Sequence, residues 1–226
     1  SRDHDESASS GESSFVLPSS LATIDVRSGD AGDVAIAARE MAVLPDGTIS
    51  SEALEFSSGN AGDVTVTVAE TLRMELSSEI SASSRGSGFA GIVEVKAQRL
   101  DMIGGAINSF TGGSSDAGLV GVFVDELNMT GGRIDSASDS VLDNAGNAGS
   151  VFIAAGQASI GGWAQIDSRG FAGNAGDVTL EVFGRLEIAD MAEISAATDG
   201  AGDGGLVQVA ADELVMTGGA INSFTG

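Results

Sequence analysis

Cysteine and tyrosine are absent from this sequence of 226 residues, and histidine occurs once, as His4. Without cysteine the chain has no disulfide bond and no thiolate metal site. The one histidine lies in a polar, serine-rich opening segment. A Ser-His-Asp triad and a histidine-ligated metal centre are therefore excluded from the rest of the chain. The sequence also has no G-x-x-x-x-G-K-(S/T) phosphate loop.

Basic residues are few: 10 lysines and arginines stand against 33 aspartates and glutamates, which gives a formal net charge of −23. Phosphate backbones and anionic lipid surfaces attract basic patches. We therefore expect neither nucleic-acid binding nor adsorption to an anionic membrane. No apolar run approaches the ~20 residues that a membrane-spanning helix requires, so direct membrane insertion is not predicted either.

Proline occurs only twice, whereas glycine occurs 33 times. Many of these glycines belong to a phrase of six residues, Gly-(Asn/Asp)-Ala-Gly-x-Val, which recurs along the chain in strict and looser copies. A period of about 30 residues is typical of stacked structural units. The fourth position of the phrase is always glycine, and successive copies lie 27 to 31 residues apart, at Gly32, Gly62, Gly91, Gly118, Gly149, Gly176 and Gly205.

Each phrase is followed by two short stretches of alternating apolar residues and then by one isoleucine. Alternation with a period of two predicts β-strands. The sequence thus predicts an all-β fold, a right-handed parallel β-helix (β-solenoid) with three short strands per coil and about seven coils of 27–31 residues. The isoleucines should stack in the core, at Ile24 in a partial first coil and then at Ile49, Ile80, Ile107, Ile134, Ile166, Ile194 and Ile221.

The chain divides into two parts. Residues 1–14 are polar and serine-rich, and we interpret them as a flexible leader or linker. Residues 15–226 form the predicted repeat domain, which we expect to be a fragment of a longer protein because it stops within a repeat. At ~4.8 Å per coil, this domain would be a stiff rod roughly 35 Å long.

A second, longer period is superimposed on the first. The phrase that starts at Gly59 recurs from Gly173, and the octapeptide Gly-Ala-Ile-Asn-Ser-Phe-Thr-Gly of residues 105–112 recurs at 219–226, in both cases 114 residues later. The identity includes side chains that should face outward, such as Asn108 and Asn222. A recent duplication and selection for a repeating surface both explain this pattern.

The second position of the phrase is usually Asp or Asn, at Asp30, Asn60, Asp116, Asn147, Asn174 and Asp203. These residue types form turns and tolerate left-handed backbone conformations, and the flanking glycines would serve positive φ. Turn formation is therefore the first interpretation. Calcium binding is the alternative, since calcium prefers six to eight oxygen ligands, and its candidate ligands are Asp30, Asp33, Asp63 and Asp177. We expect no other cofactor.

The residue after each isoleucine should face outward, and this polar row contains Asp25, Ser81, Asn108, Asp135, Asp167, Ser195 and Asn222. It is either a solvated face or a surface for glycan hydroxyls, for which amides and carboxylates are good acceptors. Phe123 and Phe152 should also point outward on neighbouring coils, beside Gly121, and Trp163 should lie near a turn. The predicted contact surface therefore contains Phe123, Phe152, Trp163, Asn108, Asp135, Asp167 and Asn222.

A polysaccharide lyase would need a basic residue beside acidic ones that hold a cation or substrate. Six basic residues of the repeats are too dispersed along the sequence to nominate one: Arg85, Lys96, Arg99, Arg133, Arg169 and Arg185. No catalytic residue is therefore predicted. A cleft that brings acids and an arginine together on one face would favour such an enzyme.

The repeat phrasing resembles that of a known family. Residues 173–180 (Gly-Asn-Ala-Gly-Asp-Val-Thr-Leu), followed by Leu186-Glu187-Ile188 and residues 192–196 (Ala-Glu-Ile-Ser-Ala), are similar to repeats of filamentous-haemagglutinin-like exoproteins. The resemblance covers residues 24–226. It implies a long right-handed β-helix in a large bacterial surface adhesin of a two-partner secretion system, exported through an outer-membrane partner transporter. The family's secretion domain is not recognisable here, so the export route is implied by similarity alone.

Repeat, composition and resemblance together predict a non-catalytic structural and adhesive segment of a secreted or cell-surface bacterial protein. Its expected partners are glycans or proteins on a host or neighbouring cell. The alternatives are a lyase-like carbohydrate-active enzyme and a subunit that self-associates into a filament or sheath. For the coil arrangement itself, Ile134→Asp should be severe, whereas Asn108→Asp should be mild because Asn108 faces outward.

Overall fold

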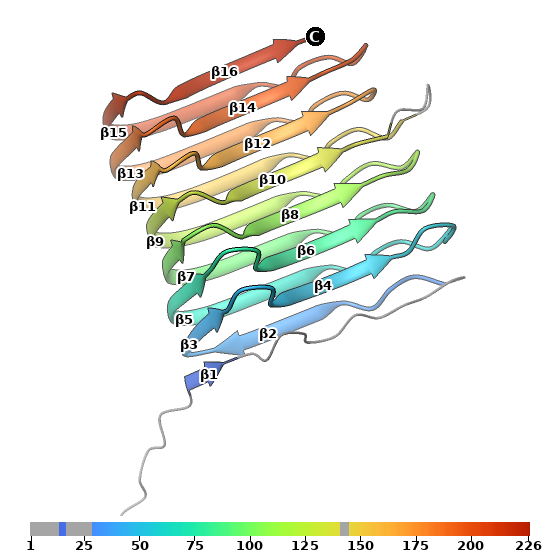
Figure 1. Ribbon diagram of the computed structural model, residues 1–226, viewed down its shortest axis with the longest axis horizontal. Helices are drawn as coiled ribbons and strands as arrows, with labels where there is room; N and C mark the ends of the chain where they lie inside the picture. Colours follow the sequence, from blue (N-terminus) through green and yellow to red (C-terminus); the bar gives the residue numbers. More distant parts are fainter. Residues whose placement is uncertain (1–13, 17–28, 141–144) are drawn as a thin grey trace, which may run out of the picture.

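The computed structural model describes residues 14–16, 29–140 and 145–226. Every regular element in these residues is a β-strand, and the strands stack in parallel to form a β-solenoid (Figure 1). Residues 1–13 of the predicted leader, the partial coil around Ile24, and Asp25 lie outside the described residues, whereas Ser14, the last residue of that leader, begins β1. Within the described part, no helix has the length and apolar character to cross a bilayer.

The strands form two sheets. The long-strand sheet consists of β1 (Ser14–Val16), β2 (Val34–Ala38), β3 (Glu40–Val43), β5 (Val64–Met74), β7 (Val93–Met102), β9 (Val120–Thr130), β11 (Val151–Gly161), β13 (Val178–Ala189) and β15 (Val207–Thr217). The short-strand sheet consists of β4 (Thr48–Ala53), β6 (Glu79–Ser84), β8 (Ala106–Thr111), β10 (Arg133–Ser138), β12 (Gln165–Gly170), β14 (Glu193–Thr198) and β16 (Ala220–Thr225).

One coil is a strand of the first sheet followed by a strand of the second, and the described residues contain seven coils. Equivalent residues of successive coils lie in register. Ile134 of β10, for example, pairs with Ile107 of β8 and with Ile166 of β12. The predicted parallel β-solenoid of about seven coils is confirmed.

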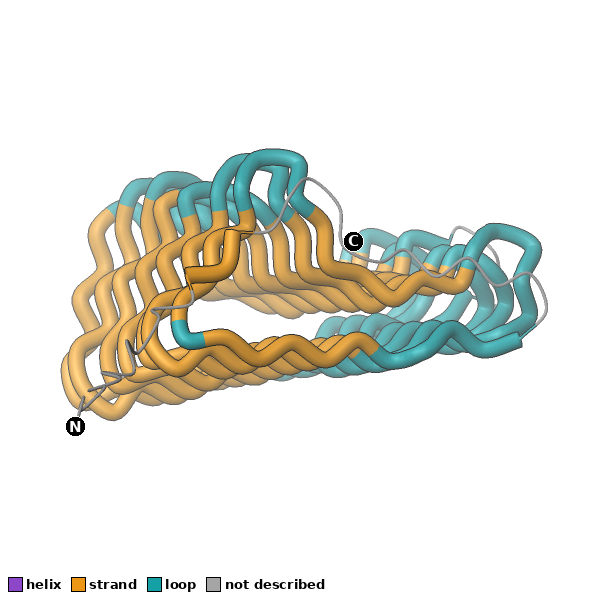
Figure 2. Tube along the Cα trace, turned by 90° about the horizontal axis from the view of Figure 1, so that it is seen from below, coloured by secondary structure: helices purple, strands orange, loops and turns teal. Residues whose placement is uncertain are grey.

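The number of strands per coil differs from the prediction of three. From the second coil onward, the two apolar stretches after each phrase belong to one continuous strand of 10 to 12 residues, and only β2 and β3 are separate. The residues between the stretches, such as Ala69 and Glu70 in β5, include no proline, and Gly156 and Gly184 are the only glycines among them in the described strands. These segments therefore contain few of the residues that favour a tight turn. The strand therefore changes direction without ending, and shifts of register mark the place between Val68 and Thr71. Figure 2 shows the long strands bending at this corner.

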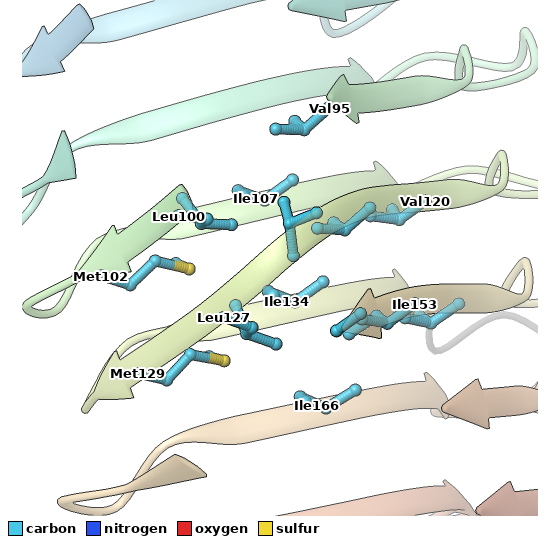
Figure 3. Close-up of a cluster of buried hydrophobic side chains, with 14 of the residues drawn as sticks. Val95, Leu100, Met102, Ile107, Val120, Leu127, Met129, Ile134, Ile153 and Ile166 are labelled. Carbon is cyan, nitrogen blue, oxygen red and sulfur yellow. The ribbon is translucent and has the colours of Figure 1, made fainter. Parts of the chain in front are cut away.

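The core lies between the two sheets and consists of ladders of like residues. The isoleucine ladder is buried from Ile49 to Ile194, with no exposed surface at any step. Leu100, Met102, Leu127 and Met129 face it from the long strands (Figure 3). Burying each such side chain contributes roughly 1.5–3 kcal/mol. Since neighbouring coils supply both the packing and the hydrogen bonds, no coil is stable alone.

The expected rod shape requires a correction. Seven coils at ~4.8 Å give a stack roughly 35 Å long. The 11 residues of β5 measure roughly 36 Å along the bent strand, and the loops of the same coil extend the cross-section further (Figure 2). The cross-section of the described coils is therefore of the same order as the length of the stack.

The glycines of the repeated phrase allow two coils to approach each other closely. A Cβ atom on Gly149 would overlap the carbonyl oxygen of Gly118 in the preceding coil, and one on Gly91 would overlap that of Gly62. None of the motif glycines in the described residues has a left-handed φ. The expectation that these glycines adopt positive φ is therefore wrong. Glycine is required here because any side chain would collide with the neighbouring coil.

The fourth glycines of the phrase, such as Gly118 and Gly149, stack from coil to coil as a glycine ladder. Buried serines connect this glycine ladder to the short-strand sheet. The Ser136 hydroxyl donates to the carbonyl oxygen of Gly118 at 2.8 Å and accepts from the Gly149 N–H at 2.9 Å. Ser51, Ser109 and Ser168 make the same pair of bonds in their own coils. The sequence showed a small residue at this position but not its role as a bridge between coils.

Replacing Ser136 with alanine should lower the free energy of unfolding by about 1–3 kcal/mol, because it leaves a buried N–H and a buried carbonyl without this partner. Denaturant unfolding followed by circular dichroism measures this change. Ser159→Ala is the matched control, because Ser159 is exposed on β11, and it should change little. Equal losses in both variants would contradict the bridging role.

Candidate functional site

A groove with a volume of about 560 Å³ lies on the outer face of the short-strand sheet. We call it the outer groove. Figure 2 looks along the stack and shows the short strands running between two rows of loops. The groove is lined by outward-facing side chains of β6, β8 and β10 and by neighbouring residues: Glu55, Glu79, Ser83, Arg85, Ala106, Asn108, Phe110, Gly112, Arg133, Asp135, Ala137, Asp139 and Arg169.

Strand alternation explains why these residues gather. In β10 the core-facing Ile134 and Ser136 alternate with Arg133, Asp135 and Ala137, which face the groove. The prediction that the residue after each isoleucine points away from the core agrees with the placement of Asn108 and Asp135 in the groove.

Two residues of the polar row that follows the isoleucines are not solvated. Asp135 is only 4% exposed and Asp167 only 8%. Neighbours one coil away cover each residue, and the guanidinium of Arg133 lies against both carboxylates. The interpretation of these two aspartates as solvated is therefore wrong.

Arg133, Asp135 and Asp167 form a compact charged cluster. Arg133 donates from Nε to Asp167 Oδ1 at 2.9 Å and from Nη2 to Asp167 Oδ2 at 2.7 Å, which is a bidentate pair. Asp135 Oδ1 lies 3.3 Å from the same Nε, but it accepts no hydrogen bond. The single Nε hydrogen is directed to Asp167, so Asp135 Oδ1 lies beside the charge of Arg133 but receives no hydrogen bond from it.

The assessment that the basic residues are too dispersed is wrong for three of them. Arg85, Arg133 and Arg169 line the same groove, although 84 positions separate the first from the last. Arg85 pairs with Glu52 at 2.7 Å, and Arg169 with Asp139 at 3.6 Å.

The other three of the six basic residues considered lie on the long-strand sheet, each with an acidic partner: Lys96, Arg99 and Arg185. Aligning the units on their isoleucines would have revealed the cluster. Arg133 then falls one place before the isoleucine, and Asp135 and Asp167 one place after it.

Burial raises the pKa of Asp135 to about 7, against the opposing charges of Arg133 and Arg169 and with support from the negative charges of Asp167 and Asp139. Burial also opposes the charge of Arg133. The hydrogen bond to Asp167 and the neighbouring carboxylates nevertheless raise the pKa of that guanidinium above its ordinary value. Asp135 therefore changes protonation near neutral pH, whereas Arg133 stays charged.

Asp135→Asn should make the stability of the protein less sensitive to pH. The folded-state pKa of Asp135 exceeds the ~4 of an unfolded aspartate. The stabilising contribution of its neutral form is therefore complete below about pH 4 and is lost as the pH rises to about 7. At pH 8 the variant should melt a few degrees above the wild type, and at pH 4 the two should nearly coincide.

Thermal unfolding between pH 4 and pH 8 measures this difference. Asp125→Asn is the control, because Asp125 is exposed on β9 and lies outside the outer groove. A difference in melting temperature between Asp135→Asn and the wild type that stays constant across the range would contradict the titration of a buried carboxyl.

The Asp and Asn residues of the repeated phrase form a ladder between coils. Asp30 Oδ1 accepts the backbone N–H of Asn60 at 2.8 Å, and Asn60 Oδ1 accepts that of Phe89 at 2.9 Å. No phrase residue in the described part has a left-handed φ, so the expected turn conformation is wrong. Most left-handed residues lie at the opposite corner of the coil, for example Asp46 and Ser77, whereas Phe56 lies in the loop before a copy of the phrase.

The four calcium candidates belong to this corner of the coil. Asp30, Asp33, Asp63 and Asp177 each use Oδ1 to accept a backbone N–H from the next coil. Across residues 14–16, 29–140 and 145–226, no three His, Cys, Asp or Glu side chains are grouped so that they could hold a metal ion. The carboxylates therefore have a structural role that needs no metal.

The predicted aromatic contacts lie apart from the outer groove. Phe123 and Phe152 meet on the outer face of the long-strand sheet with their ring centroids 5.7 Å apart, and Lys96 Nζ lies 5.7 Å from the Phe123 centroid. A Cβ on Gly121 would lie 3.1 Å from the Phe123 ring, so Phe123 lies over this glycine as expected. Trp163 is 70% exposed at the turn between β11 and β12.

The contact residues predicted from sequence therefore do not form one surface. The groove and its edge hold Asn108, Asp135 and Asp167, while the phenylalanine pair, Trp163 and Asn222 of the last coil lie elsewhere. Phe110, which lines the groove, was missing from the prediction. Two signals in the sequence mark it: its identity with Phe224 in the 114-residue repeat, and its place three residues after Ile107, which strand alternation turns outward.

Comparison of the chain with protein-family models, with curated proteins and with solved structures gave no match.

Proposed function

We propose that this chain is a non-catalytic structural and adhesive segment of a large bacterial surface protein. The observation that carries the proposal is the unbroken stack of seven coils, in which the same core ladders and the same backbone contacts repeat from coil to coil. Such a stack resists bending and extends in proportion to the number of coils. It suits a spacer that carries binding surfaces away from a cell.

The likeness of the repeats to filamentous-haemagglutinin-like exoproteins supports the proposed location at the bacterial surface. By that likeness the protein is secreted through an outer-membrane partner transporter and presented at the cell surface. The net charge of −23 supports a partner other than nucleic acid or anionic lipid. The partners proposed are glycans or proteins of a host or neighbouring cell.

Bead attachment tests the adhesive role. Fluorescent beads that carry the chain through its last residue are counted on epithelial cells and on bacterial cells. Beads with the Ile134→Asp variant have almost the same composition but lack the fold, and they serve as the control. More attachment by the wild-type beads is the expected result, and equal counts would defeat the proposal.

A carbohydrate-active enzyme is the second candidate, because the outer groove gathers acids and arginines on one face. Asp135 has a pKa of about 7, which suits a general acid or base, and Asp167 lies beside it on the next coil. The bidentate pair with Arg133 already occupies the Asp167 carboxylate, which favours the non-catalytic proposal. Release of reducing ends or unsaturated products from a polysaccharide, abolished by Asp135→Asn, would establish the enzyme instead.

A further inference from the structure

The floor of the outer groove contains two acceptor atoms without donors. Asn108 and Asp135 are neighbours across β8 and β10, and both line the groove. Asn108 Oδ1 and Asp135 Oδ1 are buried and accept no hydrogen bond. Asn108 uses its amide to donate to Glu79 at 3.3 Å, and Arg133 directs its Nε–H to Asp167.

Buried polar atoms without a partner cost free energy, and native proteins leave few of them. Above the pKa of Asp135, about 7, its carboxylate has no proton and both atoms are acceptors, so a ligand that satisfies them must bring donors. The terminal torsions of Asn and Asp are soft, so a modest rotation turns each oxygen toward the groove. A polyhydroxylated ligand supplies donors at the right scale, since Asn108 and Asp135 are neighbours on strands ~4.8 Å apart.

An aromatic side chain lies on the same strand as Asn108. Phe110 lines the groove, and a Cβ on Gly112 would lie 3.6 Å from its ring. Its partners in register are Ser83 and Ala137, both small, so the ring is the largest apolar surface of the groove. An aromatic ring beside hydrogen-bond acceptors matches a ligand with an apolar face and a polar edge, as a pyranose ring has.

The charges of the groove argue against an ionic ligand. The three arginines already have carboxylate partners in Glu52, Asp167 and Asp139. An anion would also approach a chain of net charge −23. A cation would meet the guanidinium of Arg133, which lies within 3.3 Å of both aspartates.

We propose that the outer groove binds a short neutral oligosaccharide, whose hydroxyl groups donate to Asn108 and Asp135 and whose sugar ring packs on Phe110. The stretch from β6 to β10 spans roughly 10 Å, which accommodates a few sugar rings. This inference rests on the proposed adhesive function and names the partner class for one of its surfaces.

Isothermal titration calorimetry tests the inference with defined probes: oligomers of glucose, galactose and N-acetylglucosamine, and oligogalacturonate as the anionic comparison. At least one neutral oligomer should bind the wild-type chain. Phe110→Ala and Asn108→Ala should each weaken that binding about tenfold or more. Circular dichroism verifies that each variant remains folded.

The 114-residue repeat provides a matched control. Phe224 and Asn222 belong to the same octapeptide as Phe110 and Asn108, but their neighbours in register are Ala197 and Ser195, and they lie outside the outer groove. Phe224→Ala and Asn222→Ala should leave the affinity unchanged. Ala137→Trp fills the groove without removing a contact and should abolish binding.

Three outcomes would overturn the inference: no binding of any neutral oligomer, binding of oligogalacturonate alone, or equal losses in the Phe110 and Phe224 variants. Bead attachment to cells that persists without saccharide binding would refute the groove proposal and leave the adhesive role standing. Saccharide binding without any bead attachment would do the reverse.

Discussion

Ile134→Asp is expected to unfold the stack around the fourth coil. Ile134 has no exposed surface and lies between Ile107 and Ile166 in the core. An aspartate there would place a charge among aliphatic side chains with no partner, and burying a charge in this way costs far more than one apolar contact contributes. We expect a loss of more than about 4 kcal/mol, measured by thermal or denaturant unfolding followed by circular dichroism.

Thr67→Asp is a suitable control for this prediction. Thr67 is exposed on β5, and its neighbour in register is Lys96, so the new charge would remain in water beside a cation. Thr67→Asp is a better control than the Asn108→Asp variant suggested by the sequence. Asn108 lies in the groove beside Asp135 and donates to Glu79, so a new carboxylate there would face other acidic groups. Similar losses in Ile134→Asp and Thr67→Asp would contradict the assignment of faces.

Gly149→Ala is expected to have the second large effect, although it adds only one methyl group. Its Cβ would overlap the carbonyl oxygen of Gly118, which is backbone and cannot rotate away. The two coils would have to separate, which would strain the hydrogen bonds that join Ser136 to both glycines. A loss of about 3 kcal/mol or more in the free energy of unfolding is expected.

Gly161→Ala isolates the effect of this close approach. A Cβ on Gly161 would find its nearest neighbour at 3.7 Å, an ordinary contact, and the residue has no left-handed φ. Denaturant unfolding should therefore show a small change for Gly161→Ala and a large one for Gly149→Ala. If Gly149→Ala were equally mild, the glycine ladder would not be what sets the distance between coils.

The fold was predictable because each coil repeats the same pattern of apolar and polar residues. Alternating apolar residues and a recurrent isoleucine specify which side chains face inward, and the period of 27 to 31 residues sets the length of a coil. A strand shifted by one residue would expose Ile107, Ile134 and Ile166 together, so the register follows from the pattern. The ladder partners of these isoleucines could therefore be stated without coordinates.

The path of the chain within one coil was harder to predict. The break expected near Ala69 is a bend in a continuous strand, because a period-two pattern does not distinguish two strands from one strand that bends. The sequence suggests that the phrase glycines provide positive φ, whereas in the structure they provide the space for close contact between coils. Both uses of glycine produce the same letters in the sequence.

The candidate site depended most on the tertiary structure. Sequence alternation correctly placed Asn108 and Asp135 on the outward face. It could not show that this face is concave and that neighbouring coils shield Asp135 from water. Arg85, Arg133 and Arg169 are far apart along the chain and meet only because successive coils are in register.

The sequence by itself determined the parallel stack, its coil number and its inward ladders, because burial of apolar residues acts at every repeat. Only the tertiary structure decided that Arg133 directs its hydrogen bonds to Asp167 rather than to Asp135 Oδ1, and which acceptors stay without donors. Those properties depend on distances of about 3 Å between side chains of different coils. A repeating pattern determines which residues become neighbours, but not the directions in which their polar atoms point.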